Sequence, residues 1–162
     1  MAADACRPAV NPQPSTPDLN APSEAIGRRP LVAVLPFETL GGGPSVQGLG
    51  GEIADVLRER LEKDPVLHAI LISSDFLAKA PPHAIELICR ELRVGYLISG
   101  KCHAQGRGEP SLYVEVTDTR DWHIHWADFY RERARALLVD EGGTMTGLVA
   151  SLRRLLVEQP TR

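Results

Sequence analysis

Apolar residues recur along residues 48–63 with the spacing of an amphipathic helix. The spacings are i, i+4, i+7, i+8 and i+12, which places every one of these residues on one stripe of a helical surface. The stripe consists of Leu49, Ile53, Val56, Leu57 and Leu61. The dipeptide Asp64-Pro65 ends this predicted helix, because the residue before a proline is disfavoured in the helical region of backbone space.

Short apolar runs on either side of this helix predict two strands, at 31–35 and at 66–73. The first run stops at Pro36, and the second is rich in isoleucine and leucine. A second helix is predicted after the pair Pro81-Pro82, because proline fits the first helical turn. Its apolar side is predicted from Ile85, Ile88 and Leu92, with Leu87 beside them and Gly95 as the C-terminal glycine.

Three strands in close succession are predicted at 96–103, 112–118 and 122–130. The turns between them are short, which favours an antiparallel meander. The middle strand alternates apolar and wetter positions, so one of its faces is predicted to be buried. The apolar set is Leu112, Val114 and Val116, and the wetter set is Tyr113, Glu115 and Thr117.

A last helix is predicted at 144–157, with Thr144 as its N-cap. The predicted order of elements is therefore β-α-β-α-β-β-β-α. This order indicates an α/β (α+β) fold, with a single mixed sheet of about five strands and three helices.

Composition divides the chain into a folded part and two ends. Residues 1–29 are rich in proline, with asparagine, serine and threonine between the prolines. Such a segment buries too little apolar surface to offset its ordering entropy, so we predict a disordered tail or spacer there. The folded domain is predicted to span residues 30–158, followed by a disordered end at 159–162.

Charge and hydropathy are ordinary for a soluble globular protein. The chain of 162 residues is 43% hydrophobic and 24% charged, with a formal net charge of -3. That charge gives no overall attraction to nucleic acid or to anionic lipid. No apolar run approaches the ~20 residues that span a bilayer.

The first residues, including Cys6, lack the pattern of a secretory signal, and the cysteine count is odd. We therefore expect reduced thiols and a cytoplasmic location.

The glycine-rich segment 41–51 invites a comparison with phosphate-binding loops. A dinucleotide fingerprint has three glycines in the pattern Gly-x-Gly-x-x-Gly at the start of a helix, and the third glycine is missing after Gly48-Leu49-Gly50. No lysine follows Gly48, and Glu52 in the first turn would repel a phosphate. We therefore predict a connecting loop, with no cofactor.

Histidine and cysteine side chains offer a candidate metal site. His123 and His125 share a strand face by their spacing, and Cys102 could supply a thiolate. The middle strand of the predicted meander separates Cys102 from the histidines by roughly 9–10 Å, which is too far for one ion. We therefore expect no metal, and His123 with His125 remains the alternative zinc pair.

Nucleophilic catalysis has little support in the sequence. Ser73, Ser74 and Asp75 follow the second predicted strand, but no Gly-x-Ser-x-Gly elbow occurs in the chain. No serine, histidine and acid can be joined by spacing into a triad. We therefore expect that the protein is not an enzyme.

Three stretches carry a resemblance to a known family. They are Val-Leu-Pro-Phe at 34–37, Ile-Cys-Arg-Glu-Leu-Arg-Val-Gly-Tyr-Leu-Ile-Ser-Gly at 88–100, and Ile-His-Trp-Ala-Asp-Phe-Tyr at 124–130. Together they resemble the TolB amino-terminal-like domain, over about residues 29–157. The resemblance implies a non-catalytic bacterial α/β domain that assists assembly or signalling beside adenylate cyclases and winged-helix regulators. It implies no catalytic residues.

Two functions follow as hypotheses. The first is a binding module for a protein partner or for self-association, such as a homodimer, because an exposed strand edge must be covered or paired. Its predicted contacts are Phe37, Glu38, Thr39, Gly41, Gly43, Trp122 and Trp126.

The second hypothesis is a small-ligand sensor with a pocket at the carboxyl ends of the first two strands. Its predicted lining is Glu38, Thr39, Ser73, Ser74 and Asp75.

Overall fold

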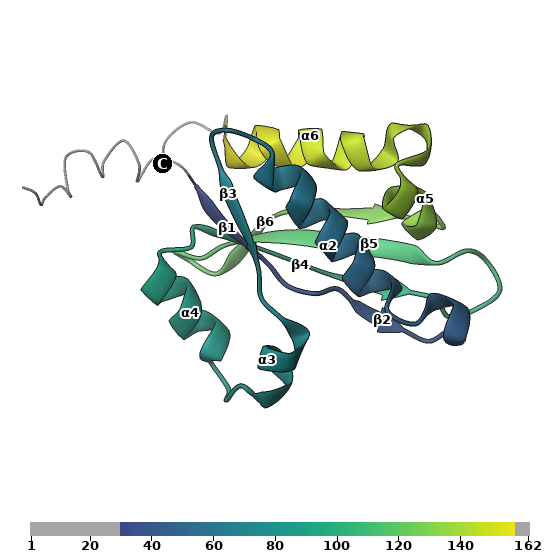
Figure 1. Cartoon of the computed structure of the whole chain (residues 1–162), viewed down its shortest axis with the longest axis horizontal. Helices are drawn as coiled ribbons and strands as arrows, with labels where there is room; N and C mark the ends of the chain where they lie inside the picture. The colour runs from purple at the N-terminus through teal and green to yellow at the C-terminus, as the bar shows by residue number, and fades with distance from the viewer. Residues whose placement is uncertain (1–29, 158–162) are drawn as a thin grey trace, which may run out of the picture.

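The computed structural model describes residues 30–157, so the predicted tail and end lie outside the described residues. The described chain forms one mixed sheet with helices on both faces (Figure 1). The strands are β1 (Leu31–Val34), β2 (Glu38–Leu40), β3 (His68–Leu71), β4 (Tyr96–His103), β5 (Ser111–Asp118) and β6 (His123–Tyr130). The α-helices are α2 (Leu49–Glu62), α3 (Ser74–Lys79), α4 (Ala84–Leu92), α5 (Ala134–Val139) and α6 (Thr144–Leu156). Short 3-10 turns lie at Pro44–Val46 and Glu141–Gly143.

The sheet has the strand order β3-β1-β4-β5-β6, and β2 pairs with the far half of β4. The strand β1 runs parallel to both β3 and β4. The strands β4, β5 and β6 form the antiparallel meander predicted from the sequence. The predicted α/β class and the single mixed sheet are therefore confirmed, with six strands in the described chain.

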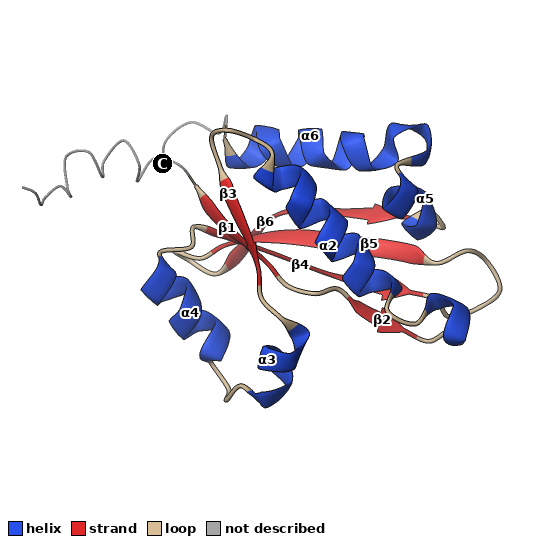
Figure 2. Ribbon diagram, viewed as in Figure 1, coloured by secondary structure: helices blue, strands red, loops and turns tan. Residues whose placement is uncertain are grey.

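The two faces of the sheet are covered unequally. Helices α2, α5 and α6 lie over one face, while α3 and α4 lie under only part of the other (Figure 2). The main core between α2, α6 and the sheet is fully enclosed, and its largest buried side chains include Ile53, Leu57, Ile98, Leu112 and Leu152. A smaller core under α4 contains Ala33, Ile72, Cys89, Val94 and Leu97. No helix of the described residues is long and apolar enough to cross a membrane.

Phe37 joins the first strand to the helix above it. Proline at position 36 interrupts the strand, and Phe37 turns inward and is only 3% exposed. An ideal Cβ on Gly50 would lie 2.3 Å from the Phe37 carbonyl oxygen. A Cβ on Gly100 would lie 2.3 Å from the Tyr113 carbonyl oxygen and 3.3 Å from the Phe37 ring. Both glycines therefore allow close approach of other backbone, which a larger residue would prevent.

Three short elements were missed in the sequence. They are β2, α3 and α5, each of three to six residues. Such lengths give too few positions for a hydrophobic period to show. The second predicted strand is correspondingly shorter than expected, because Ser73 is not part of it and serves as the N-cap of α3.

Three predictions about helix surfaces and ends are wrong. On α4, Leu87 and Leu92 are 51% and 50% exposed, while Cys89 and Ala84 are buried. The left-handed residue that ends α4 is Arg93 rather than Gly95. The N-cap of α6 is Gly143, and the Thr144 hydroxyl instead donates to the Glu141 carbonyl oxygen. In each case the backbone turn at the end of the helix decides which side chains are buried and which residue caps the helix. The apolar pattern of the sequence does not record that turn.

Replacing Gly50 by alanine tests the close contact with Phe37. Alanine normally stabilises a helix by about 1 kcal/mol over glycine. At Gly50 we expect the opposite, a net loss of about 1–3 kcal/mol, because the new methyl group meets backbone that cannot move aside. The matched control is Gly51→Ala in the same helical turn, where nothing lies within 4 Å of the new Cβ. Urea unfolding of the two variants gives the comparison, and equal stabilisation by both would contradict it.

Candidate functional site

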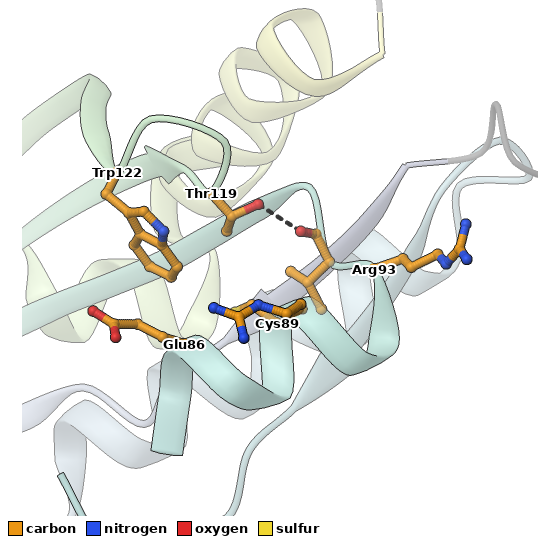
Figure 3. A pocket seen from close by; sticks show the side chains of 7 residues that line it. Glu86, Cys89, Arg93, Thr119 and Trp122 are labelled. Carbon is orange, nitrogen blue, oxygen red and sulfur yellow. Dashed lines mark hydrogen bonds between the residues drawn. The ribbon is translucent and has the colours of Figure 1, made fainter. Parts of the chain in front are cut away.

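A pocket of about 520 Å³ lies between α4 and the turn that joins β5 to β6, and we call it the α4 pocket. It is lined by Glu86, Cys89, Arg90, Arg93, Val94, Thr119 and Trp122. Figure 3 shows the Trp122 side chain directed at α4, toward Glu86, while the Arg93 side chain points away. Two segments that are distant in the sequence therefore form its walls.

Thr119 fixes the distance between these walls. Its hydroxyl donates to the Val94 carbonyl oxygen at 2.6 Å and lies 3.1 Å from the Gly95 carbonyl oxygen. Its backbone N–H also donates to Gly95, at 3.1 Å. The side-chain bond to Val94 is visible in Figure 3. The turn is thus tied to the loop after α4, so the pocket is preformed.

Backbone strain gathers around the same pocket. Trp122 has φ of 59° and Arg93 has φ of 59°, both in the left-handed region that glycine favours. His83, at the start of α4, has φ of 72°, and its Nδ1 lies 3.2 Å from Glu86. A bulky residue in this region costs of order 1–3 kcal/mol, and such residues cluster at functional sites.

The charges in the pocket are unbalanced. Glu86 is paired with His83. Among the described residues, the guanidinium groups of Arg90 and Arg93 have no ion-pair partner. The floor is apolar, and burial raises the pKa of the Cys89 thiol, which keeps the sulfur neutral and unreactive. The pocket therefore combines an indole, an apolar floor and the exposed guanidinium of Arg90.

An acidic cluster lies on the turn beside this pocket. Side-chain atoms of Asp118, Asp121 and His125 lie within 4.8 Å of one another and could hold a metal ion. The buried Asp118 carboxylate, however, accepts two bonds from the Arg120 guanidinium, at 3.1 and 2.7 Å. A cation would have to displace that arginine. The geometry therefore favours a structural ion pair over metal binding.

The predicted histidine pair shares one carboxylate. Asp121 lies 3.8 Å from His123 and 3.4 Å from His125. The backbone N–H of His123, with a further contribution from His125, lowers the pKa of the Asp121 carboxyl. Cys102 is fully buried two strands away on β4, so the structure does not bring it to the histidines.

The outer strand β6 is the most exposed of the three long strands. Its burial pattern is exposed at six of eight positions, whereas β5 is buried at six of eight. Ile124 and Phe129 are 54% and 51% exposed. Trp126 packs against the main core, and burial raises the pKa of Tyr130 to about 12. Of the predicted aromatic contacts, Trp122 is thus a pocket wall and Trp126 a partly buried core residue.

The face of the sheet beyond α4 is also open. The register aligns Ser99, Glu115 and Ala127 in one row, and Lys101, Tyr113 and Phe129 in the next. We call these six residues the open face. Ser99 and Tyr113 both donate to the Glu115 carboxylate, at 3.4 and 2.9 Å. A shallow depression of about 350 Å³ lies over this network.

The glycine loop forms a separate depression of about 400 Å³. It brings together the predicted residues Thr39, Gly41 and Gly43, while Glu38 is exposed beside it on β2. Phe37 is instead a core residue. The Thr39 hydroxyl accepts the Gly50 backbone N–H at 2.9 Å, so a side chain already occupies one of the donors that a phosphate would use.

The other predicted sensor residues have a structural role. The Ser73 hydroxyl accepts the Phe76 backbone N–H at 3.0 Å and caps α3. Ser74 and Asp75 form the first turn of that helix, where an acidic side chain suits the helix dipole. They line neither the glycine-loop depression nor the α4 pocket. A capping signal at Ser73 could have revealed α3 in the sequence.

No protein-family model and no curated protein matches the chain. Among solved structures it is similar to the PelC dodecamer from Paraburkholderia phytofirmans, with 14% identity, 82% of this chain and 91% of PelC covered, and a TM-score of 0.50. The chain is also similar to TolB from Acinetobacter baumannii, with 13% identity and a TM-score of 0.49. This match covers 82% of the present chain and 29% of TolB. A third similar structure is the LpoB C-terminal domain from Escherichia coli, with 15% identity and a TM-score of 0.42. This match covers 67% of the present chain and 89% of the LpoB domain. These likenesses concern the fold and assign no site.

Replacing Thr119 by valine tests whether its hydroxyl holds the α4 pocket. Valine has nearly the same shape but no donor, so the Val94 and Gly95 carbonyl oxygens lose a partner. We expect a loss of about 1–2 kcal/mol in the free energy of unfolding. Thr117→Val is the control, because the hydroxyl of this neighbouring β5 residue makes no hydrogen bond to a described residue. Guanidinium unfolding measures both, and a Thr119→Val variant as stable as the control would contradict this role.

Proposed function

We propose that the chain is a non-catalytic binding module that associates with a second copy of itself through β6. The observation that carries the proposal is the exposed outer edge of this strand. Within residues 30–157, no strand pairs with β6 on the side away from β5. Unpaired backbone donors and acceptors along an eight-residue strand form a template for another strand.

The side chains of β6 do little to protect this edge. Natural edge strands are blunted by lysine, proline or covering segments, and β6 contains neither lysine nor proline. Its one acidic residue is Asp128. A register shift opposite Val116 and Thr117 bulges the strand at His125, but residues 126–130 pair regularly with β5. This regular segment and its exposed apolar residues are suited to pairing with another strand.

A two-fold axis at Ala127 gives a self-complementary arrangement of two β6 strands. It opposes Ala127 to its own copy and Trp126 to Asp128. Because each strand has a bulge at His125, the next pair is Ile124 with Phe129. Ile124 and Phe129 lie on the same side of the sheet, as their partners Thr117 and Tyr113 on β5 indicate. The pairing therefore covers the two most exposed apolar side chains of β6.

The same axis also matches polar groups. Asp128 lies on the opposite side of the sheet from Phe129 and would face His125 and Trp126 of the second copy. The histidine ring can donate to that carboxylate. Pairing across this axis is isologous, so each strand contributes the same contacts twice and the association closes as a dimer.

The wider setting is part of the same proposal. The resemblance to the TolB amino-terminal-like domain supports an accessory role in a bacterial regulatory system. The odd number of cysteines supports a location in a reducing compartment such as the cytoplasm. PelC, which shares the fold, is described as a dodecamer, so the mass measurement must also resolve larger assemblies.

Mass as a function of concentration tests the association. Sedimentation equilibrium of the full chain should give twice the 17.7 kDa of one chain. Phe129→Lys places a charge opposite Ile124 of the second copy, and we expect it to weaken association at least tenfold. Val139→Lys is the matched control, because Val139 is 70% exposed on α5, outside β6. A monomer at all concentrations would refute self-association, and equal effects of both lysines would place the contact elsewhere.

A covalent cross-link tests the position of the axis. Opposed residues of paired antiparallel strands have Cβ atoms about 4.5–5.5 Å apart, close to the range of a disulfide. In a Cys6→Ser background, Ala127→Cys should therefore form a disulfide dimer on mild oxidation, while Val139→Cys stays monomeric under denaturing electrophoresis. Cys89 and Cys102 are buried and should not react. Dimerisation of both cysteine variants to the same extent would contradict the axis at Ala127.

A further inference from the structure

We infer that the α4 pocket binds a small organic anion that carries a flat ring. In this assignment the ring packs on Trp122 and the acid group binds the guanidinium of Arg90. The pocket lies within one chain, so the inference does not depend on the proposed self-association. It also differs from the sensor site expected at the strand ends, since no residue of that set lines it.

The shape of the pocket favours a small molecule. Its volume of about 520 Å³ falls in the range of ligand sites, roughly 300–1,000 Å³. The hydrogen bonds of Thr119 hold both walls in place before any ligand arrives. Binding of a ligand therefore requires little further ordering of the pocket residues, and this preorganisation favours affinity.

The lining groups define the chemistry of the ligand. The Trp122 indole, 40% exposed, offers an aromatic face, and the buried Cys89 and Val94 form an apolar floor beneath it. Arg90 is exposed and has no ion-pair partner among the described residues. The Glu86 carboxylate lies 3.2 Å from the Nδ1 of His83, so it opposes an anion less when that ring is protonated. An unpaired guanidinium beside an aromatic wall suits a ring that bears a carboxylate, sulfonate or phosphate.

The conformation of Trp122 supports a binding role. Its position in the turn between β5 and β6 requires positive φ, which glycine or asparagine would adopt with less strain. Tryptophan at this position directs a large flat side chain across the pocket opening. Backbone strain of this kind lowers the stability of the fold, so a tryptophan at this position points to a role for its side chain in binding.

Titration followed by nuclear magnetic resonance tests the site directly. The chain has two tryptophans, so its indole N–H signals report separately on Trp122 and Trp126 once Trp126→Phe has assigned them. The probes are naphthalene-2-sulfonate, its neutral analogue naphthalene-2-sulfonamide, and methanesulfonate, which lacks the ring. We expect a saturable shift of the Trp122 signal with naphthalene-2-sulfonate, and a Kd at least about tenfold higher for the other two probes.

Two variants assign the contacts. Arg90→Gln should raise the Kd for naphthalene-2-sulfonate about tenfold or more, because it removes a charge-assisted hydrogen bond. Arg107→Gln is the matched control, since Arg107 is an exposed arginine in the turn between β4 and β5. Trp122→Gly suits the positive φ, so this variant should remain folded and lose the binding. Its binding is followed by naphthalene fluorescence.

Any of three results would overturn the inference. The first is the absence of a saturable Trp122 shift. The second is equal binding of the sulfonate and the neutral sulfonamide, which would indicate only an apolar patch. The third is either an unchanged Kd in Arg90→Gln or an equal loss of affinity in Arg107→Gln. The equal loss would indicate a general attraction of the anion to positive charge.

Discussion

The contact of Phe37 with two glycines is the constraint on which the rest of the fold depends. Its carbonyl oxygen lies only 2.3 Å from the position that a Cβ of Gly50 would take, and its ring packs against Gly100 of β4. The first contact sets how closely α2 approaches the sheet, and the second fixes the chain after Pro36 over the central strand. Pro36 interrupts the strand after β1, and beyond Phe37 the chain pairs again as β2 with the far half of β4.

Unequal coverage of the sheet follows from this arrangement and leaves the surfaces that can bind. The helices α2, α5 and α6 enclose one face, where the core side chains are almost wholly buried. The other face has only α3 and α4 at one end, so the rows that end at Ala127 and Phe129 stay open. The edge strand β6 supplies Ala127 and Phe129 to these open rows, and the turn before it supplies Trp122 to the α4 pocket.

Periodicity predicted the long elements because their packing repeats many times. On the stripe of α2, Leu49, Ile53, Leu57 and Leu61 are buried as expected, and Val56 is half-buried. The alternating residues Leu112, Val114 and Val116 of β5 are also buried. Thr117 is the exception, since it is 8% exposed although its neighbours suggested a wetter face. The side chains of α4 depart further, because that helix packs through Ala84 and Cys89 and leaves two leucines in solvent.

The sequence by itself determined the class of fold, the antiparallel meander and the two long amphipathic helices, since each is encoded in a local repeat. It also singled out Trp122 and the pair His123 and His125, because aromatic and imidazole side chains stand out in a strand. Only the tertiary structure decided what these residues face. The α4 pocket brings Arg90 of α4 together with Trp122 of the turn between β5 and β6. Contacts between distant segments depend on strand order and turn geometry, which no local pattern records.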